Sequence, residues 1–398
     1  MSNGWRSVPA ASVARIEIGG TPAREQPTFW ADQDSGHAWA SIADLTSVVV
    51  LETAEYISDL GVASSNVKLV PAGTPIMSFK LTIGRTALAG RDLYTNEAIA
   101  AFFTDPAQVD ERFLFHILPG SARAVITDVA IKGATLNKKS LAKMQLTIPP
   151  LPEQRRVAEI LDTVDCLIQS TEQIIAKMGA ARLGLVERLI RQESPNVTLG
   201  SALVGTPTNG IYKPAYLIGR GTLLVGQTAI NHDRRVISTA ARRAVVTSGE
   251  AKRFGLISGD ILVSRVFATL EGVGQPALIE QLDETAVYES NMMRLRCDSS
   301  KADPFFVFQS LLTGSARAHV VRQANISNQA SISQSVLTAF PLWLPSMDQQ
   351  LRVSEAIRSA EVEIGAERAR LKKLKAVKSG LLADLLTGRV RVPSEVAS

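Results

Sequence analysis

The 398-residue chain lacks most of what an enzyme, a metalloprotein or a membrane protein needs. It has only two cysteines, Cys166 and Cys297, which lie far apart without a CxxC pair. Such use of cysteine argues for a reducing compartment and against zinc. No run of about 18 apolar residues could span a bilayer, and the N-terminus lacks the basic-then-apolar layout of a signal peptide. We therefore expect a cytoplasmic protein.

Catalytic and cofactor-binding motifs are also missing. There is no GxxxxGK[ST] phosphate loop, no GxGxxG dinucleotide fingerprint and no GxSxG nucleophile elbow. The Asn/Asp-Pro-Pro-Tyr segment with which amino-group methyltransferases hold a base is absent too. The four histidines have no metal-ligand spacing: His37, His116, His232 and His319. We expect neither catalysis nor a metal site.

The composition is that of an ordinary folded protein, with 45% hydrophobic and 20% charged residues. The length suits two to four structural units. The formal net charge of +5 and the pI of about 9.2 permit a nucleic-acid partner without requiring one.

The main feature of the sequence is an internal duplication. A shift of 196 residues aligns 141–189 with 337–385 without a gap. Identical residues meet at Leu141, Leu146, Pro149, Gln154, Arg156, Val157, Glu159, Lys177, Ala180, Gly184, Leu185 and Leu189 of the first copy. Weaker matches upstream keep the same order, for example 120–123 with 314–317. A repeat of this kind decides the architecture.

Each copy ends in the pattern of a long helix. The first follows Ile148–Pro152, and the second starts near Met347 and stops at Thr387-Gly388. Apolar residues recur in steps of three and four at Val157, Ile160, Val164, Leu167, Ile174, Met178, Ala181 and Leu185, and again at Val353, Ile357, Ala360, Ile364, Leu371, Leu374, Val377, Leu381 and Leu385. This spacing indicates a coiled-coil seam. We expect two helices of roughly 52–60 Å that pair antiparallel as a spacer; an ordinary internal bundle is the alternative.

Short β-rich runs and helical patches precede each helix. The runs are 47–51, 75–79, 221–225, 259–263 and 286–288, and 304–312 reads as a helix. The expected fold class is α+β: two α/β domains joined by two long antiparallel coiled-coil helices, as a tandem duplication with a pseudo-twofold arrangement. The predicted segments are a domain at 1–148, a helix at 149–192, a domain at 193–344, a helix at 345–392 and a tail at 393–398.

The basic residues of both domains lie largely in or beside predicted loops. There they could contact phosphates or pair with guanine edges. The candidates are Lys80, Arg85, Arg91, Lys213, Arg220, Arg234, Arg235, Arg242, Arg243 and Arg265. For any single arginine a solvated surface explains the pattern better, and only the clustered pairs Arg234/Arg235 and Arg242/Arg243 weigh the two interpretations about equally.

Taken together, the chain resembles the specificity subunit of a type I restriction–modification system over nearly its whole length. Gly19–Pro22 followed by Trp39–Leu45 is similar to the opening of a target-recognition domain, Pro149–Leu161 to the start of the central helix, and Gly380–Val390 to the ending. The second copy departs from the pattern, because Pro345–Gln350 stands where the family has Pro-Pro-Leu-x-Glu-Gln. The two partner-docking surfaces therefore need not be equivalent.

The resemblance implies that each domain reads one half of a split DNA site while the helices fix the unread gap. Two methyltransferase subunits carrying S-adenosylmethionine would dock on the helices and flip adenines out of the duplex. Two restriction subunits using ATP and Mg could join them, and this chain would bind no cofactor itself. The expected helix-packing and docking residues are Glu153, Gln154, Val157, Ile160, Val164, Gln350, Val353, Ile357, Leu374 and Leu381.

Two other classes of protein fit the same features. One is a coiled-coil adaptor that organises proteins and reads no DNA, and the other is the recognition subunit of a different DNA defence system. The adaptor predicts no sequence preference among random duplexes, whereas neighbouring genes for a methyltransferase and a helicase-nuclease would indicate a type I system.

Overall fold

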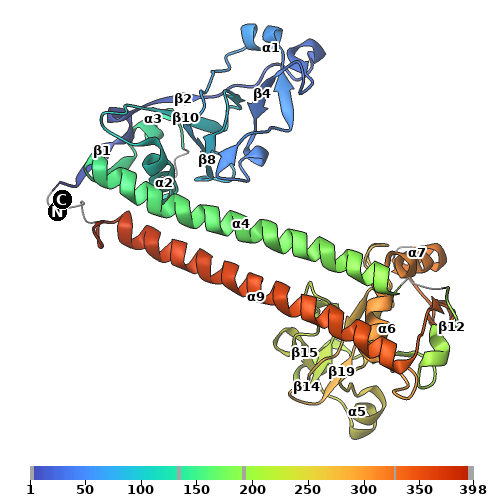
Figure 1. The fold of residues 1–398 in the computed structure, drawn as a ribbon. Helices are drawn as coiled ribbons and strands as arrows, with labels where there is room; N and C mark the ends of the chain where they lie inside the picture. Colours follow the sequence, from blue (N-terminus) through green and yellow to red (C-terminus); the bar gives the residue numbers. More distant parts are fainter. Residues whose placement is uncertain (1–3, 132–135, 191–193, 327–328, 393–398) are drawn as a thin grey trace. The chain divides into compact units, whose positions relative to one another are not determined.

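A computed structural model describes residues 4–131, 136–190, 194–326 and 329–392 (Figure 1). The chain forms two compact units: unit 1 comprises 1–173 with 368–398, and unit 2 comprises 174–367. Each unit therefore includes a part of both long helices. The predicted tail at 393–398 lies outside the described residues. Among the described helices, none combines the length and apolar character that crossing a bilayer requires.

Unit 1 contains an α/β domain built on two mixed sheets. Its strands are β1 (Arg6–Pro9), β2 (Ala14–Ile18), β3 (Trp30–Ala31), β4 (His37–Ala40), β5 (Val49–Val50), β6 (Glu55–Ile57), β7 (Pro75–Ser78), β8 (Thr86–Ala89), β9 (Tyr94–Thr95), β10 (Ile99–Thr104) and β11 (Gln145–Ile148). Its helices are α1 (Asp59–Ala63), α2 (Glu111–Ile131), α3 (Lys138–Lys143) and the first part of α4 (Leu151–Ile190).

Unit 2 contains the second domain. Its strands are β12 (Val197–Thr198), β13 (Thr208–Asn209), β14 (Ile218–Val225), β15 (Arg242–Ala244), β16 (Ile261–Ser264), β17 (Val266–Phe267), β18 (Pro276–Leu278), β19 (Ala286–Tyr288), β20 (Met292–Leu295), β21 (Asn325–Ile326), β22 (Ala330–Ser331) and β23 (Pro341–Leu342). Its helices are α5 (Ser248–Phe254), α6 (Pro304–Leu311), α7 (Gly314–Gln323), α8 (Gln334–Thr338) and the first part of α9 (Met347–Leu385).

The two domains share the core of their topology, so the duplication extends beyond the helices. The central sheet has the order β2-β10-β7-β8-β5 in unit 1 and β13-β20-β16-β18 in unit 2. A second sheet places β4 between antiparallel β6 and parallel β9, and β14 lies in the same way between β15 and β19. The pairs β1–β11 and β12–β23 then close each domain just before its long helix. The predicted fold class is confirmed.

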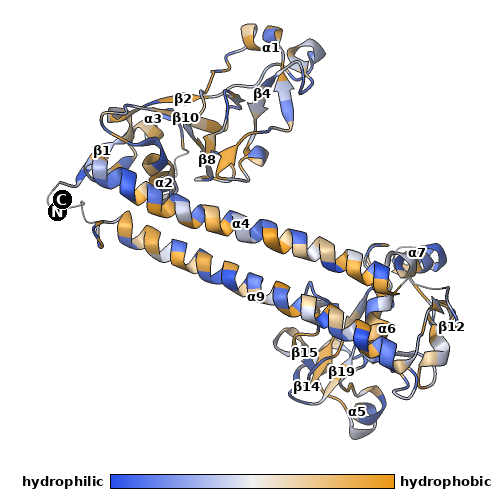
Figure 2. Cartoon of the chain, viewed as in Figure 1, coloured by the Kyte–Doolittle hydropathy of each residue, from blue (hydrophilic) through white to orange (hydrophobic). Residues whose placement is uncertain are grey.

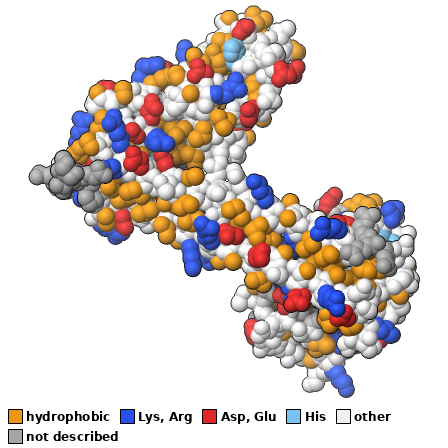
Figure 3. All heavy atoms as spheres, viewed as in Figure 1, with side chains coloured by type: hydrophobic (Ala, Val, Ile, Leu, Met, Phe, Trp, Pro, Cys, Tyr) orange, Lys and Arg blue, Asp and Glu red, His pale blue; other side chains and the backbone are white. Residues whose placement is uncertain are grey.

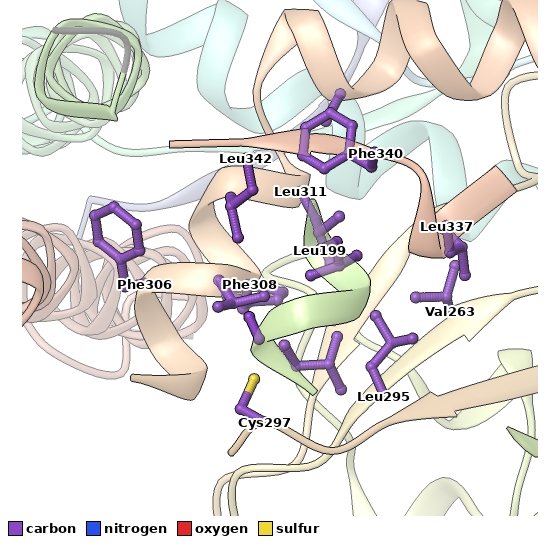
Figure 4. Close-up of a cluster of buried hydrophobic side chains, with 14 of the residues drawn as sticks. Leu199, Val263, Leu295, Cys297, Phe306, Phe308, Leu311, Leu337, Phe340 and Leu342 are labelled. Atoms are coloured by element: carbon purple, nitrogen blue, oxygen red, sulfur yellow. The ribbon is translucent and has the colours of Figure 1, made fainter. Parts of the chain in front are cut away.

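Each domain has a core of its own that includes the neighbouring helix ends. In unit 2 the apolar face of α6 packs with strands and with the segment that precedes α9, as Phe306, Phe308, Leu337 and Leu342 show in Figure 4. Ile357 of α9 and Val186 of α4 join this core. In unit 1, Val157 and Leu161 of α4 and Leu385 of α9 join the other core in the same way. Burial of these side chains, worth about 1.5–3 kcal/mol each, attaches the helices to the domains.

The long helices carry an apolar stripe (Figure 2), but one row of the predicted seam is wrong. On α4 the predicted seam residues Leu167 and Ile174 are 40% and 38% exposed, respectively. The next residues along, Ile168 and Ile175, are half-buried, and Leu161 is fully buried. The sequence has two adjacent apolar rows, one with Ile160, Leu167 and Ile174 and the other with Leu161, Ile168 and Ile175. The second row is the more buried one, because Leu161 packs into the domain core together with Leu385.

A buried glutamine joins each domain to its helix. Gln154 accepts from the backbone N–H of Asp110 at 2.9 Å and donates to the carbonyls of Gln108 and Pro149. Gln350, its counterpart in the repeat, accepts from Asp303 at 2.8 Å and donates to the carbonyls of Lys301 and Pro345. Both side chains are buried. We call this contact the glutamine tie.

The glutamine tie shows that the second helix start keeps one contact of the first, although its sequence departs from the Pro-Pro-Leu-x-Glu-Gln pattern. Four positions between the shared proline and the shared glutamine have drifted, and the last of them is Glu153 in the first copy and Gln349 in the second. The Glu153 carboxylate is buried and pairs with Arg391, which follows α9, at 2.8 Å. Gln349 is exposed. The copies therefore share the tie, and the Glu153–Arg391 ion pair belongs to the first copy.

The helix-to-helix ion pairs repeat as well. In unit 1, Asp165 of α4 pairs with Lys378 of α9 at 2.5 Å. In unit 2, Glu361 of α9 pairs with Arg182 of α4 at 2.6 Å. The 196-residue shift turns one pair into the other. In unit 1 the pair joins the first half of α4 to the second half of α9, and in unit 2 it joins the second half of α4 to the first half of α9. The two helices therefore run antiparallel.

Candidate nucleic-acid interface

Equivalent hairpins project from the central sheet of each domain. In unit 1, β7 and β8 are joined after Ser78, whose N–H donates to Arg85 and whose carbonyl accepts from Gly84 at 2.9 Å. In unit 2, Ser264 makes the same two bonds with Gln275 and Gly274. Gly84 and Gly274 both have positive φ, a conformation that glycine adopts at little cost. We call these the reading hairpins, 79–85 and 265–275.

The reading hairpin of unit 1 carries two of the three predicted basic residues of that domain. Lys80 and Arg85 are exposed on it, and Leu81 between them is 92% exposed with φ of 56°. Arg91, which follows β8, is exposed as well. Exposed cations beside an exposed apolar side chain are a combination that could bind phosphates and a base edge.

In unit 2 the structure places most predicted arginines and lysines in pairs within the chain. Lys213 binds both carboxylate oxygens of Glu250 at 2.8 Å. Arg242 pairs with Glu289, and Arg243 pairs with Glu284 at 2.6 Å, a contact that raises the pKa of Arg243. Arg265, on the reading hairpin, is half-buried and donates to the carbonyl of Ser290.

Arg235 lies at the centre of a network that fastens the domain to α9. Its guanidinium is 13% exposed and pairs with Glu280 at 3.0 Å and Glu361 at 2.8 Å. It also stacks over Phe308, with 4.6 Å to the ring centroid. The neighbouring Arg234 has φ of 58°, and burial lowers its pKa. These contacts give Arg235 a structural role, because two carboxylates and an aromatic face already occupy its guanidinium.

Sequence reasoning picked out Lys213 of the loop before β14 but missed the two exposed tyrosines beside it. Tyr212 and Tyr216 are 77% and 80% exposed, and Arg220 is exposed beside two glycines with positive φ. Lys213 anchors the loop to Glu250 of α5, so the tyrosines on either side of it project outward from a fixed base.

A signal for this loop does exist in the sequence. Gly210 directly follows β13 as Gly19 follows β2, and an added Cβ at either position would collide with a main-chain oxygen, of Glu289 or Thr95. Pro22-Ala23 then corresponds to Pro214-Ala215. Aligning the halves on these glycines would have placed the tyrosines in an equivalent loop.

The residues expected to pack the helices or dock partners are mostly buried inside the chain. Glu153, Gln154, Val157, Val164, Gln350 and Ile357 are buried, and Ile160, Val353, Leu374 and Leu381 are half-buried. Their contacts within each unit account for helix packing.

Charges of both signs are interspersed on the face shown in Figure 3, without one broad basic patch there. Among the described residues, no three histidine, cysteine or acidic side chains gather as metal ligands would. His116, for example, is buried and bonds Asp162 at 2.8 Å, which ties α2 to α4.

Comparison with known proteins agrees with this architecture. Residues 3–178 match the family described as the type I restriction modification DNA specificity domain. The MjaVIII specificity subunit of Methanocaldococcus jannaschii is 21% identical over 274 residues, covering 65% of this chain and 64% of the relative. The StySPI specificity subunit of Salmonella potsdam is 26% identical over 250 residues, covering 58% and 53%. The matches thus span less than two thirds of these relatives.

Two solved structures share the fold over almost the full length. A chain from a study of complex assembly and conformational transition of the type I R-M system has a TM-score of 0.62 at 14% identity, covering 98% of this chain and 99% of that one. The S subunit from M. genitalium has a TM-score of 0.57 at 11% identity, covering 97% of both chains. Residues 3–178, which include the first domain and part of α4, therefore match the type I restriction modification DNA specificity domain, and the chain as a whole has the fold of these two solved structures.

Proposed function

We propose that the chain selects a bipartite DNA site, with each unit reading one half of it. The observation that carries the proposal is the repetition of a whole domain, reading hairpin included, in front of each long helix. Two copies of one reading element in one chain fit a target of two short blocks with an unread gap, because the distance between modules sets half-site spacing.

The reading hairpins and the loop that carries Tyr212 and Tyr216 are the proposed contact surfaces. Lys80, Arg85, Arg91 and Arg220 would supply phosphate or guanine contacts, and the exposed side chains Leu81, Tyr212 and Tyr216 would supply apolar contact with bases. Arg235 is left out because its guanidinium holds the domain to α9.

The chemistry would come from partners. The helices would carry two adenine methyltransferase subunits that bring S-adenosylmethionine, and restriction subunits using ATP and Mg could join the complex. The chain itself would provide the address and no catalytic group.

Selection from a pool of random duplexes tests the reading function. The chain, purified together with its methyltransferase subunit, should enrich two short motifs separated by a constant unread gap. The double variant K80A/R85A should degrade one motif and R220A the other, since they alter the proposed contact surfaces of different units. A protein-organising adaptor would enrich no motif at all, and that result would refute the proposal.

A further inference from the structure

The two reading hairpins expose charges of opposite sign. The hairpin of unit 1 exposes Lys80 and Arg85, which donate hydrogen bonds and carry positive charge. The exposed side chains of the unit 2 hairpin, 265–275, are Ala268, Thr269 and Glu271. Its arginine, Arg265, is half-buried. The charged group that unit 2 exposes on its reading hairpin is therefore a carboxylate.

Side chains hold the turn that carries Glu271. The Arg317 guanidinium of α7 donates to the carbonyls of Leu270 and Val273, which lie on either side of Glu271. The Glu271 carbonyl itself accepts from the Gln275 side chain at 2.9 Å. Three carbonyls of the turn are thus bound within the chain, so the backbone that displays Glu271 is fixed.

Packing beneath the turn fixes it further. Phe267 places its ring against Gly272, where an added Cβ would collide with that ring. Val273 is fully buried, and the half-buried Phe267 and Leu270 pack against the core of the domain. A side chain on a preorganised turn loses little freedom on binding and can discriminate between ligands by geometry.

The Glu271 carboxylate is exposed and acts as an acceptor. Bonds from its own backbone N–H and from the Thr269 side chain lower the pKa of Glu271, and the charge of Arg317 acts in the same direction. At neutral pH the ionised group can only accept hydrogen bonds. In the major groove cytosine and adenine present amino donors, whereas guanine presents O6 and N7 and thymine presents O4 as acceptors. A carboxylate there attracts the first two bases and repels the other two.

The unit 2 hairpin adjoins the loop that carries the exposed tyrosines. The N–H of Ser290 donates to the carbonyl of Ile211, the residue before Tyr212, at 3.0 Å. The carbonyl of Ser290 accepts from Arg265, the first residue of the hairpin, at 3.3 Å. One residue therefore connects the loop with the hairpin, and a single duplex could contact both.

We propose that Glu271 is a specificity-determining residue of unit 2 that accepts a hydrogen bond from the amino group of a cytosine in its half-site. Acidic side chains make this contact with cytosine N4. A carboxylate gains nothing from the phosphates, which attract cations and repel anions. Glu271 therefore contributes to the choice of base rather than to the strength of binding.

The inference rests on the proposed function for the contact with DNA. It adds which base the second hairpin reads, and the residue lies outside the basic residues that the sequence suggested. The alternative role for Glu271 is a structural one, in which its carboxylate balances the charge of Arg317. That role predicts a lower stability of unit 2 after neutralisation, whereas a reading role predicts unchanged stability.

The test compares Glu271→Gln and Glu271→Ala with Asp283→Asn. Asp283 is an exposed residue of unit 2 outside the hairpin, so its substitution removes the same charge without touching the turn. The full chain, purified with its methyltransferase subunit, selects from random duplexes, and Kd is then measured for the selected site and for each of its single-base replacements.

In both Glu271 variants we expect the preference for one cytosine of one motif to fall about 10-fold. The other motif should stay unchanged, and D283N should behave as the wild type. Binding to a duplex without either motif should not weaken, and the urea midpoint of unit 2 should stay that of the wild type.

An unchanged motif in both variants would overturn the inference, as would a preference lost at a guanine, thymine or adenine in place of a cytosine. A lower urea midpoint together with degradation of the whole motif would assign Glu271 the structural role and overturn it too. A wild-type chain that enriches no motif would instead refute the proposed function.

Discussion

Replacing the glutamine tie should destabilise each unit by a similar and large amount. In Gln154→Leu and Gln350→Leu the volume is nearly kept, but a buried backbone N–H loses its acceptor and two carbonyls lose a donor. A buried donor left without a partner costs about 1–3 kcal/mol. With the two carbonyls included, we expect a loss of about 3 kcal/mol in each case.

Urea unfolding followed by tryptophan fluorescence measures this loss unit by unit. Trp343 is the tryptophan of unit 2, and Trp5, Trp30 and Trp39 belong to unit 1. At the usual dependence on denaturant, 3 kcal/mol lowers the urea midpoint by about 1–3 M. Gln349→Leu is the control, because Gln349 is exposed beside the tie and should change stability by less than about 0.5 kcal/mol. Losses under about 1 kcal/mol, or an effect in only one unit, would refute the reasoning.

Two further predictions concern single side chains. Arg235→Ala should lower the stability of unit 2 by about 2 kcal/mol in calorimetry, because Glu361 and Glu280 lose a partly buried partner. Arg220→Ala should leave stability unchanged, but in DNA titrations it should lower the slope of log K against log salt concentration by about one. The reverse pattern would contradict both assignments. Burial raises the pKa of Cys297 to about 12, so its thiol stays protonated at pH 8 and should react with a thiol reagent only after unfolding. The exposed Cys166 should react in the native protein, and a Cys166→Ser variant that still reacts as fast would contradict this.

Much of the fold could be predicted from the sequence, because it follows from local patterns. The duplication, both long helices and the strands β7, β14, β16 and β19 rest on periodicity and on turn residues that act within a few positions. The error in the seam has a tertiary cause. Leu161 and Ile160 are equally apolar, and only the domain core decides which of the two is buried.

The candidate interface was harder to predict because exposure and pairing are long-range properties. Nothing near Arg235 in the sequence reveals that Glu361, more than a hundred residues away, neutralises it. The repeated ion pairs were also hidden, because Asp165 corresponds to a glutamate and Arg182 to a lysine.

The central claim is that the long helices set the distance between two DNA-reading domains. Inserting seven residues after Gln173 in α4 and seven after Glu367 in α9 keeps the seam in phase and lengthens each helix by about 10 Å. Mapping methylated adenines in cells that carry this variant measures the outcome directly. The account predicts both half-site motifs unchanged with a gap about 3 base pairs longer, at 3.4 Å per base pair. An active variant that methylates the original sites with the original gap would contradict it.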